Sequence, residues 1–212
     1  MVPSCFILHP SAFILTRPPT IGDMDADLLA RHFESALPYD RYVATGTPEQ
    51  QRRWQQFHGT VKLTDAQRAL LASFTRKMNV LVVSGVWCGD CVQQVPMLDH
   101  VAAANRGAID VRYVDRDERK ELSSGLRING GDRVPVAVFA AEDFEPCAVF
   151  GDRTLSRYRA LAQKQLGAAC STGLFGPAAD EVADTLQDWV NEFERVQLML
   201  RLSGRLRQKH GD

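Results

Sequence analysis

Residues 80–91 have the sequence VLVVSGVWCGDC, an apolar run followed by two closely spaced cysteines. The run at 80–83 is continuous and rich in β-branched residues, which predicts a strand buried on both faces. The pattern after Cys88 is helical and extends to about Asn105. The sequence therefore predicts a buried strand that leads directly into a C-x-x-C motif at the start of a helix.

A thiol at a helix start has unusual chemistry. The backbone N–H groups of the first turn are unpaired, and the helix dipole adds partial positive charge there. Both stabilise a thiolate and lower its pKa below the free-thiol value of about 8.5. The two-residue spacer places Cys91 one turn further, within reach of Cys88. We expect Cys88 to be the exposed attacking thiolate and Cys91 the resolving thiol, with exchange through a mixed disulfide.

The region after this motif alternates strand and helix patterns. Strands are expected at 109–115, 134–140 and 147–150, and helices near 118–126 and 154–166. The order strand, helix, strand, helix, strand, strand, helix is typical of an α/β domain with a central mixed sheet and helices on both faces. It predicts parallel crossovers together with one terminal antiparallel pair.

Helical patterns also flank this region. Apolar spacing predicts helices within 28–37, 48–57 and 64–74, and a long helix with a wide apolar face from about 182 to 200. Thr47-Pro48 and Thr64 mark two of the helix starts. The first helices either cover the α/β domain or form a unit of their own. The expected division is a loosely ordered tail at 1–24, an N-terminal helical extension at 25–63, the α/β domain at 64–170 and a C-terminal helical extension at 171–212.

Composition excludes several classes of protein. The chain has 212 residues, of which 45% are apolar and 24% are charged, and its formal net charge is −1. This balance argues against nucleic acid or an anionic membrane as a partner. No apolar run approaches the roughly 18 residues of a membrane-spanning helix. The first ten residues lack a basic segment and contain His9-Pro10, unlike a signal peptide, so we expect a cytoplasmic protein.

A second feature of the predicted site is Val134-Pro135 at the head of a strand. Proline is poorly tolerated inside a central strand because it donates no ladder hydrogen bond. A cis bond at this position would expose the backbone groups of Val134 to an extended substrate. Trp87, next to Cys88, is expected to form a partly exposed wall beside the sulfur. Trp87, Val134 and Pro135 are therefore the expected substrate-binding residues.

These residues resemble a known family. Trp87-Cys88-Gly89-Asp90-Cys91 resembles the active site of thioredoxin, with Asp90 where thioredoxin has proline. Pro96 matches the family's helix proline, Val134-Pro135 its cis-proline element, and Gly151 the glycine that ends its last strand pair. The resemblance covers about residues 64–166, and the whole chain is similar to a bacterial group of elongated thioredoxin-like proteins.

The resemblance implies a thioredoxin-like fold and thiol–disulfide oxidoreductase activity. The implied substrate is a disulfide-containing protein or small molecule, and a separate thiol compound would act as reductant. We expect no cofactor.

The sequence departs from the family at the groups that handle protons. Val82 stands where the family has a buried acid, and Val111, beside Arg112, where it has a lysine. This pair is therefore expected to be missing, so that Cys91 loses its proton either to water at the site or through Asp90. Asp90 and Gly89 are the expected modulating residues. Asp90 is expected to be exposed and to repel a thiolate on Cys88.

Two other functions stay open. The chain could be a non-catalytic thioredoxin-like interaction domain whose additional helices form a partner surface; exposure of Cys88 and a measurable reduction potential distinguish the two. The C-x-x-C motif could also be half of a zinc site. That requires Cys147, Cys170 and His100 to converge, because no second C-x-x-C exists. We expect no metal, Cys147 to be a small buried hydrophobe, and Cys5 and Cys170 to be inert.

Overall fold

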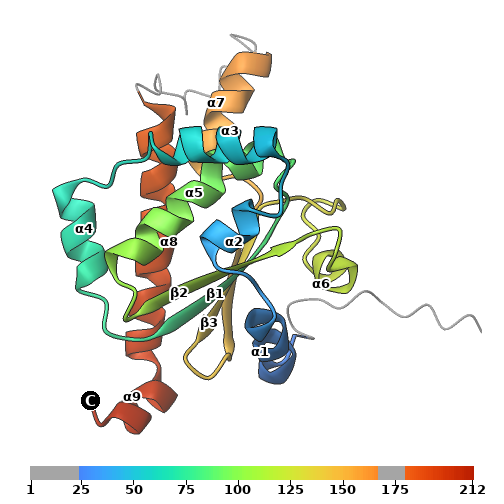
Figure 1. The fold of residues 1–212 in the computed structure, drawn as a ribbon. Coiled ribbons are helices and arrows are strands. Elements are labelled where there is room, and N and C mark those ends of the chain that lie inside the picture. The colour runs from blue at the N-terminus through green and yellow to red at the C-terminus, as the bar shows by residue number, and fades with distance from the viewer. Residues whose placement is uncertain (1–23, 167–179) are drawn as a thin grey trace, which may run out of the picture.

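The computed structural model describes residues 24–166 and 180–212. The predictions for the tail, for Cys5 and for Cys170 lie outside these residues. The described residues form a sheet with helices on both faces (Figure 1). The elements are, in chain order, α1 (Ala26–Glu34), α2 (Tyr39–Val43), α3 (Pro48–His58), α4 (Asp65–Ala72), β1 (Met78–Ser84), α5 (Gly89–Ala104), β2 (Ile109–Asp115), α6 (Lys120–Gly125), β3 (Val136–Ala141), β4 (Pro146–Gly151), α7 (Leu155–Leu166), α8 (Glu181–Leu202) and α9 (Gly204–His210).

The four strands lie in the order β2-β1-β3-β4. β1 pairs in parallel with β2, whereas the β1–β3 and β3–β4 pairs are antiparallel. The mixed sheet is confirmed, but the prediction of only one antiparallel pair is wrong. The reason is that α6 has only six residues and does not carry the chain back along the sheet. β3 therefore starts where β2 ends, with Val136 opposite Val83, and runs against β1.

The central strand β1 is buried along its whole length, as its apolar run predicts. β3 is also fully buried, but it begins at Val136 rather than at Val134. Pro135 has no N–H group for the ladder, and pairing starts at the residue that follows it. Val134 and Pro135 thus lie just outside the sheet, at the end where β1 leads into α5.

Contacts of aromatic side chains show which helices cover each face of the sheet. On one face, Phe139 and Phe150 pack edge-to-face against Phe193 and Trp189 of α8. Strand register places Tyr113 on the same face, where Tyr42 of α2 stacks on it at 5.6 Å between ring centroids. The opposite face is covered in part by α1, where Phe33 lies 5.8 Å from the Arg112 guanidinium.

Local signals explain where the first helices begin. Thr47 and Thr64 both form capping boxes, at the starts of α3 and α4. α2 was not predicted, because five residues are too few to show a helical period. α9 was not predicted either; Ser203 ends α8 and caps α9 by accepting from the Leu206 N–H. None of the described helices is long and apolar enough to span a bilayer.

Candidate active site

The two motif cysteines lie at the start of α5. Cys88 is the N-cap residue, with extended backbone angles, and Cys91 lies in the first helical turn. Both are free thiols, Cys88 half-buried and Cys91 fully buried. The structure thus gives the two sulfurs different access to solvent, with the more accessible one at the helix end.

The two thiols also differ in acidity. The pKa of Cys88 is lowered to about 6, first because the Cys91 thiol hydrogen-bonds to its sulfur and then because backbone N–H groups of Cys91 and Asp90 do so. Burial and the charge of Asp90 act in the opposite direction. The pKa of Cys91 is raised well above its usual value, first by burial and then by its interaction with Cys88. At neutral pH the pair therefore holds one thiolate and one thiol.

The segment before β3 faces this pair. The Cys88 sulfur lies 3.8 Å from the carbonyl oxygen of Val134, and the Val134–Pro135 bond is cis. The chain approaches Pro135 closely from the other side at Gly151, which has a φ of +157°. A Cβ atom at Gly151 would lie 2.4 Å from the Pro135 carbonyl oxygen. Only glycine fits there without a shift of one of the two segments.

Trp87 forms a partly exposed wall beside the pair, with 43% of its surface accessible. The Arg116 guanidinium lies 4.4 Å from the centroid of the indole ring. On the inner side the ring folds over Gly85, where a Cβ would come within 2.6 Å of the indole. The indole ring is therefore fixed between the loop at Gly85 and the Arg116 guanidinium. The sequence did not indicate that Arg116 would contact Trp87.

The surroundings of Asp90 differ from the prediction. Asp90 is not exposed, because its side chain is only 20% accessible and is held by two arginines. Arg153 Nη2 and Arg157 Nη2 lie 2.5 and 2.9 Å from its two carboxylate oxygens. These arginines also pair with Asp152 and Glu181, respectively. The Asp90 carboxylate still raises the pKa of Cys88, but two guanidinium groups oppose its charge.

Arg153 and Arg157 were missed at the sequence level. The signal that could have found Arg153 is its position two residues after Gly151, which the resemblance matched to the glycine at the end of the last strand pair.

Two further contacts hold the motif from outside. The Trp54 indole N–H of α3 donates a 2.9 Å hydrogen bond to the carbonyl of Val86, in the loop before Cys88. Gln94, in the second turn of α5, donates to the carbonyl of Asp152 at 3.0 Å. Both Trp54 and Gln94 are fully buried. The site is therefore fixed by α3 on one side and by the segment after β4 on the other.

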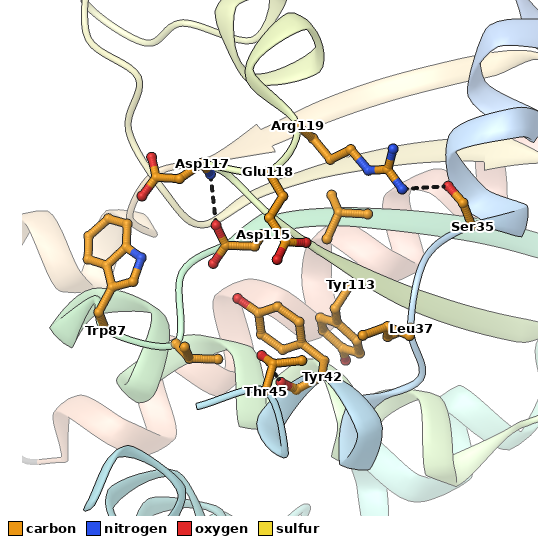
Figure 2. Close-up of a pocket in the computed structure, with 12 residues that line it drawn as sticks. Ser35, Leu37, Tyr42, Thr45, Trp87, Tyr113, Asp115, Asp117, Glu118 and Arg119 are labelled. Atoms are coloured by element: carbon orange, nitrogen blue, oxygen red, sulfur yellow. Dashed lines mark hydrogen bonds between the residues drawn. The ribbon is translucent and has the colours of Figure 1, made fainter. Parts of the chain in front are cut away.

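A pocket of about 490 Å³ opens beside Trp87 (Figure 2). Its lining combines aromatic rings and carboxylates: Ser35, Leu37, Tyr42, Thr45, Val86, Trp87, Tyr113, Val114, Asp115, Asp117, Glu118 and Arg119. Asp115 accepts a 2.8 Å hydrogen bond from the Asp117 N–H, and Arg119 donates to Ser35 at 3.1 Å. Sequence analysis did not find this pocket, because its residues come from three separate segments.

The remaining candidate residues do not join the site. Cys147 is half-buried rather than fully buried, and burial raises the pKa of its thiol. Across residues 24–166 and 180–212, no three His, Cys, Asp or Glu side chains are grouped so that they could hold a metal ion. Val82 and Val111 are both buried. They are the residues that stand where the resemblance would place a buried acid and a lysine.

Solved structures share this fold. One is the crystal structure of a protein of unknown function from Pseudomonas aeruginosa, with 19% sequence identity and a TM-score of 0.61, covering 79% of this chain and 95% of that chain. Another is an HIV epitope scaffold, with 17% identity and a TM-score of 0.56, covering 76% of this chain and 97% of that chain. At these identities the likeness concerns the fold alone.

The sequence itself matches a family model described as thioredoxin. The match covers residues 36–163, from just after α1 through most of α7, and includes both motif cysteines. It agrees with the mixed sheet and with the helices on both of its faces. The chain therefore belongs to the thioredoxin family.

Proposed function

We propose that the protein is a thiol–disulfide oxidoreductase in which Cys88 attacks and Cys91 resolves. The observation that carries this proposal is the asymmetry of the pair. Cys88 is accessible and its pKa is lowered to about 6, whereas Cys91 is buried and its pKa is raised. Attack requires a thiolate that can reach the substrate, and resolution requires a second thiol that lies beside the attacking sulfur.

The proposed reaction is the reduction of a substrate disulfide. The Cys88 thiolate bonds to one substrate sulfur and the other leaves as a thiolate, giving a mixed disulfide. Cys91 then bonds to Cys88 and releases the second substrate sulfur. Two electrons pass from the cysteine pair to the substrate, and an external thiol compound returns the pair to its reduced state. No cofactor enters these steps.

The substrate is a disulfide in a protein or a small molecule, bound between Trp87 and the Val134–Pro135 segment. The indole offers an apolar surface beside the sulfur. The backbone of Val134 offers hydrogen-bonding groups to an extended chain, as at the edge of a sheet. We place this reaction in the cytoplasm, where thiol reductants are abundant.

The test is to trap the mixed disulfide. Cys91→Ser removes the resolving thiol, so the variant should form a stable adduct with an oxidised dithiol peptide, visible by mass spectrometry. Cys88→Ser should form none, and Cys147→Ser should behave as wild type. Adduct on Cys147 instead of Cys88, or no adduct together with no measurable reduction potential of the pair, would contradict the proposal and favour a non-catalytic interaction domain.

A further inference from the structure

Asp90, inside the C-x-x-C motif, belongs to a network of ion pairs beside the reacting cysteines. Each of its carboxylate oxygens is held by one guanidinium, at 2.5 Å by Arg153 and at 2.9 Å by Arg157. All three side chains are mostly buried. Charges that are removed from solvent are screened less than surface charges, so this network acts on its neighbours more strongly than an exposed ion pair would.

Arg153 also connects the motif to the segment on the other side of the cysteine pair. Its Nη1 atom lies 3.3 Å from a carboxylate oxygen of Asp152, whose side chain is almost fully buried. The same oxygen lies 3.2 Å from Nη1 of Arg133, the residue before Val134. Because the Val134 carbonyl lies 3.8 Å from the Cys88 sulfur, one continuous chain of ion pairs joins the motif to the backbone that faces it.

The remaining partners of the network belong to α7 and α8. The Tyr158 hydroxyl donates to the second carboxylate oxygen of Asp152. Arg157 pairs with Glu181, the first residue of α8. The guanidinium groups that hold Asp90 are thus themselves held by a buried acid and by the C-terminal extension. Their position at the motif is fixed by the tertiary fold and not by the motif sequence.

The charge of Asp90 acts on the attacking thiol. The pKa of Cys88 is lowered first by the hydrogen bond from Cys91, and the Asp90 carboxylate opposes that shift because it repels the thiolate. A guanidinium at hydrogen-bond distance from a carboxylate offsets its charge and fixes its direction. Two guanidinium groups do so here, one on each oxygen. A change in either arginine should therefore be felt at the Cys88 sulfur.

We propose that Arg153 and Arg157 are positioning residues for the thiol–disulfide exchange: by fixing the Asp90 carboxylate and offsetting its charge, they maintain Cys88 as a reactive thiolate. This inference rests on the proposed function of the cysteine pair. Both arginines act through Asp90, so neither has to touch the substrate.

Removal of either guanidinium should make Cys88 less acidic. The readout is the pH midpoint of iodoacetamide alkylation at Cys88, followed by peptide mass spectrometry. In Arg153→Gln and in Arg157→Gln we expect this midpoint to rise by about 0.5 or more on the pH scale, because the Asp90 carboxylate loses a partner and repels the thiolate more strongly. Arg153→Lys keeps a cation and should recover most of the shift.

The matched control is Arg195→Gln. Arg195 pairs within α8 with Glu192, a buried residue, so this variant also removes a guanidinium from a poorly exposed carboxylate. It should lose stability as the arginine variants at the site do, but keep the wild-type alkylation midpoint. A midpoint that rises as much in Arg195→Gln as in Arg153→Gln would overturn the proposal, because the shift would then reflect general destabilisation.

A double-mutant comparison shows whether the effect passes through Asp90. In an Asp90→Asn background, Arg153→Gln should move the Cys88 midpoint by less than about half of its effect in the wild type, because no carboxylate is left to offset. A packing defect caused by the loss of Arg153 would instead move the midpoint equally in both backgrounds.

The reduction potential of the cysteine pair is an independent readout. A less stable Cys88 thiolate disfavours the reduced form, so Arg153→Gln should have a more negative potential than the wild type, measured at pH 7 in glutathione buffers. Urea unfolding of the same variant gives the structural contribution. Lower stability with an unchanged potential and an unchanged alkylation midpoint would show that Arg153 is structural only.

The outcomes separate this inference from the proposed function. A wild type without a measurable reduction potential would overturn the proposed function. A measurable wild-type potential, with a Cys88 midpoint that is unchanged in both arginine variants or moves equally in both backgrounds, would overturn the positioning role and leave the function standing. If Arg153→Gln does not fold, the same comparison with Arg157→Gln decides.

Discussion

The Cys88 sulfur lies 3.8 Å from the carbonyl oxygen of Val134, a residue 46 positions further along the chain. This contact joins the start of α5, just after β1, to the segment before β3, and the two strands are neighbours in the sheet. The carbonyl is therefore positioned by the sheet itself, and its distance from the sulfur depends on how closely the adjoining segments approach each other.

Gly151→Ala should disturb that approach. The new methyl group would meet the Pro135 carbonyl oxygen at 2.4 Å, at a φ that side chains rarely adopt. We expect a loss of about 1–3 kcal/mol in the free energy of unfolding, measured in urea. Gly204→Ala is the control, since nothing lies within 4 Å of its Cβ position at the start of α9, and it should leave stability equal or slightly higher. An unchanged Gly151→Ala protein would contradict this account of the contact.

The acidity of Cys88 should depend on the hydrogen bond from Cys91. Iodoacetamide alkylation of the wild type should rise with a midpoint near the Cys88 pKa of about 6. Cys91→Ala removes the donor and should raise that pKa, whereas Cys91→Ser keeps a donor and should raise it less. Equal midpoints in the two variants would show that the Cys91 group does not hydrogen-bond to the thiolate.

The lowered pKa of Cys88 also affects the stability of the folded protein. A thiol whose pKa falls on folding stabilises the folded state fully above its unfolded pKa, and this contribution is lost as pH falls through about 6. The raised pKa of Cys91 has the opposite effect, removing stability as pH rises above the unfolded value.

Asp90→Asn should change the pKa of Cys88 and the stability of the fold in different ways. Removing the carboxylate should lower the pKa of Cys88 further, because the charge of Asp90 raises it. It should also cost about 1–3 kcal/mol of unfolding free energy, since Arg153 and Arg157, only 23% and 12% accessible, each lose a partner. Asp65→Asn, in the exposed Asp65–Arg68 pair, should change neither quantity. A Cys88 pKa that stays the same or rises in Asp90→Asn would refute the repulsion.

A close pair of tilted histidine rings should make the fold sensitive to acid. The rings of His58 and His100 lie 4.1 Å apart, and the pKa of His100 is lowered by burial and then by the charge of His58. A lowered pKa means stability that is present above about pH 6.5 and lost as pH falls. The fall in urea midpoint between about pH 7.5 and 5.5 should be smaller in His100→Gln than in wild type. His210→Gln, an exposed imidazole, is the control; an identical fall in both variants would rule out His100 as the cause.

The sequence predicted those parts of the site that depend on neighbouring residues. Cys88 and Cys91 lie close together at a helix start, so their unequal burial and acidity follow from the local backbone. The buried run of β1 predicted the strand that carries them. The proline at the head of a strand singled out Val134 and Pro135, and the resemblance added Gly151.

The missed features are contacts between distant segments. Arg153 and Arg157 reach Asp90 across 63 and 67 residues, and no periodicity in the sequence indicates such a pairing. Tyr42 lies in a helix of five residues, too short to be recognised from apolar spacing. The direction of β3 depended on whether α6 was long enough to cross the sheet, which composition does not reveal.

The hydrogen bond from Trp54 to the Val86 carbonyl ties the motif to α3, so the motif residues alone do not include all the contacts that hold them. Grafting residues 85–91 onto another scaffold of the same family would transplant both sulfurs and the helix start. It would leave behind the indole that holds the loop and the two guanidinium groups that hold Asp90. The recipient would inherit the cysteine pair without the contacts that fix its loop and oppose the charge of Asp90, so redesign of this site has to begin from α3 and α7 as well as from the motif.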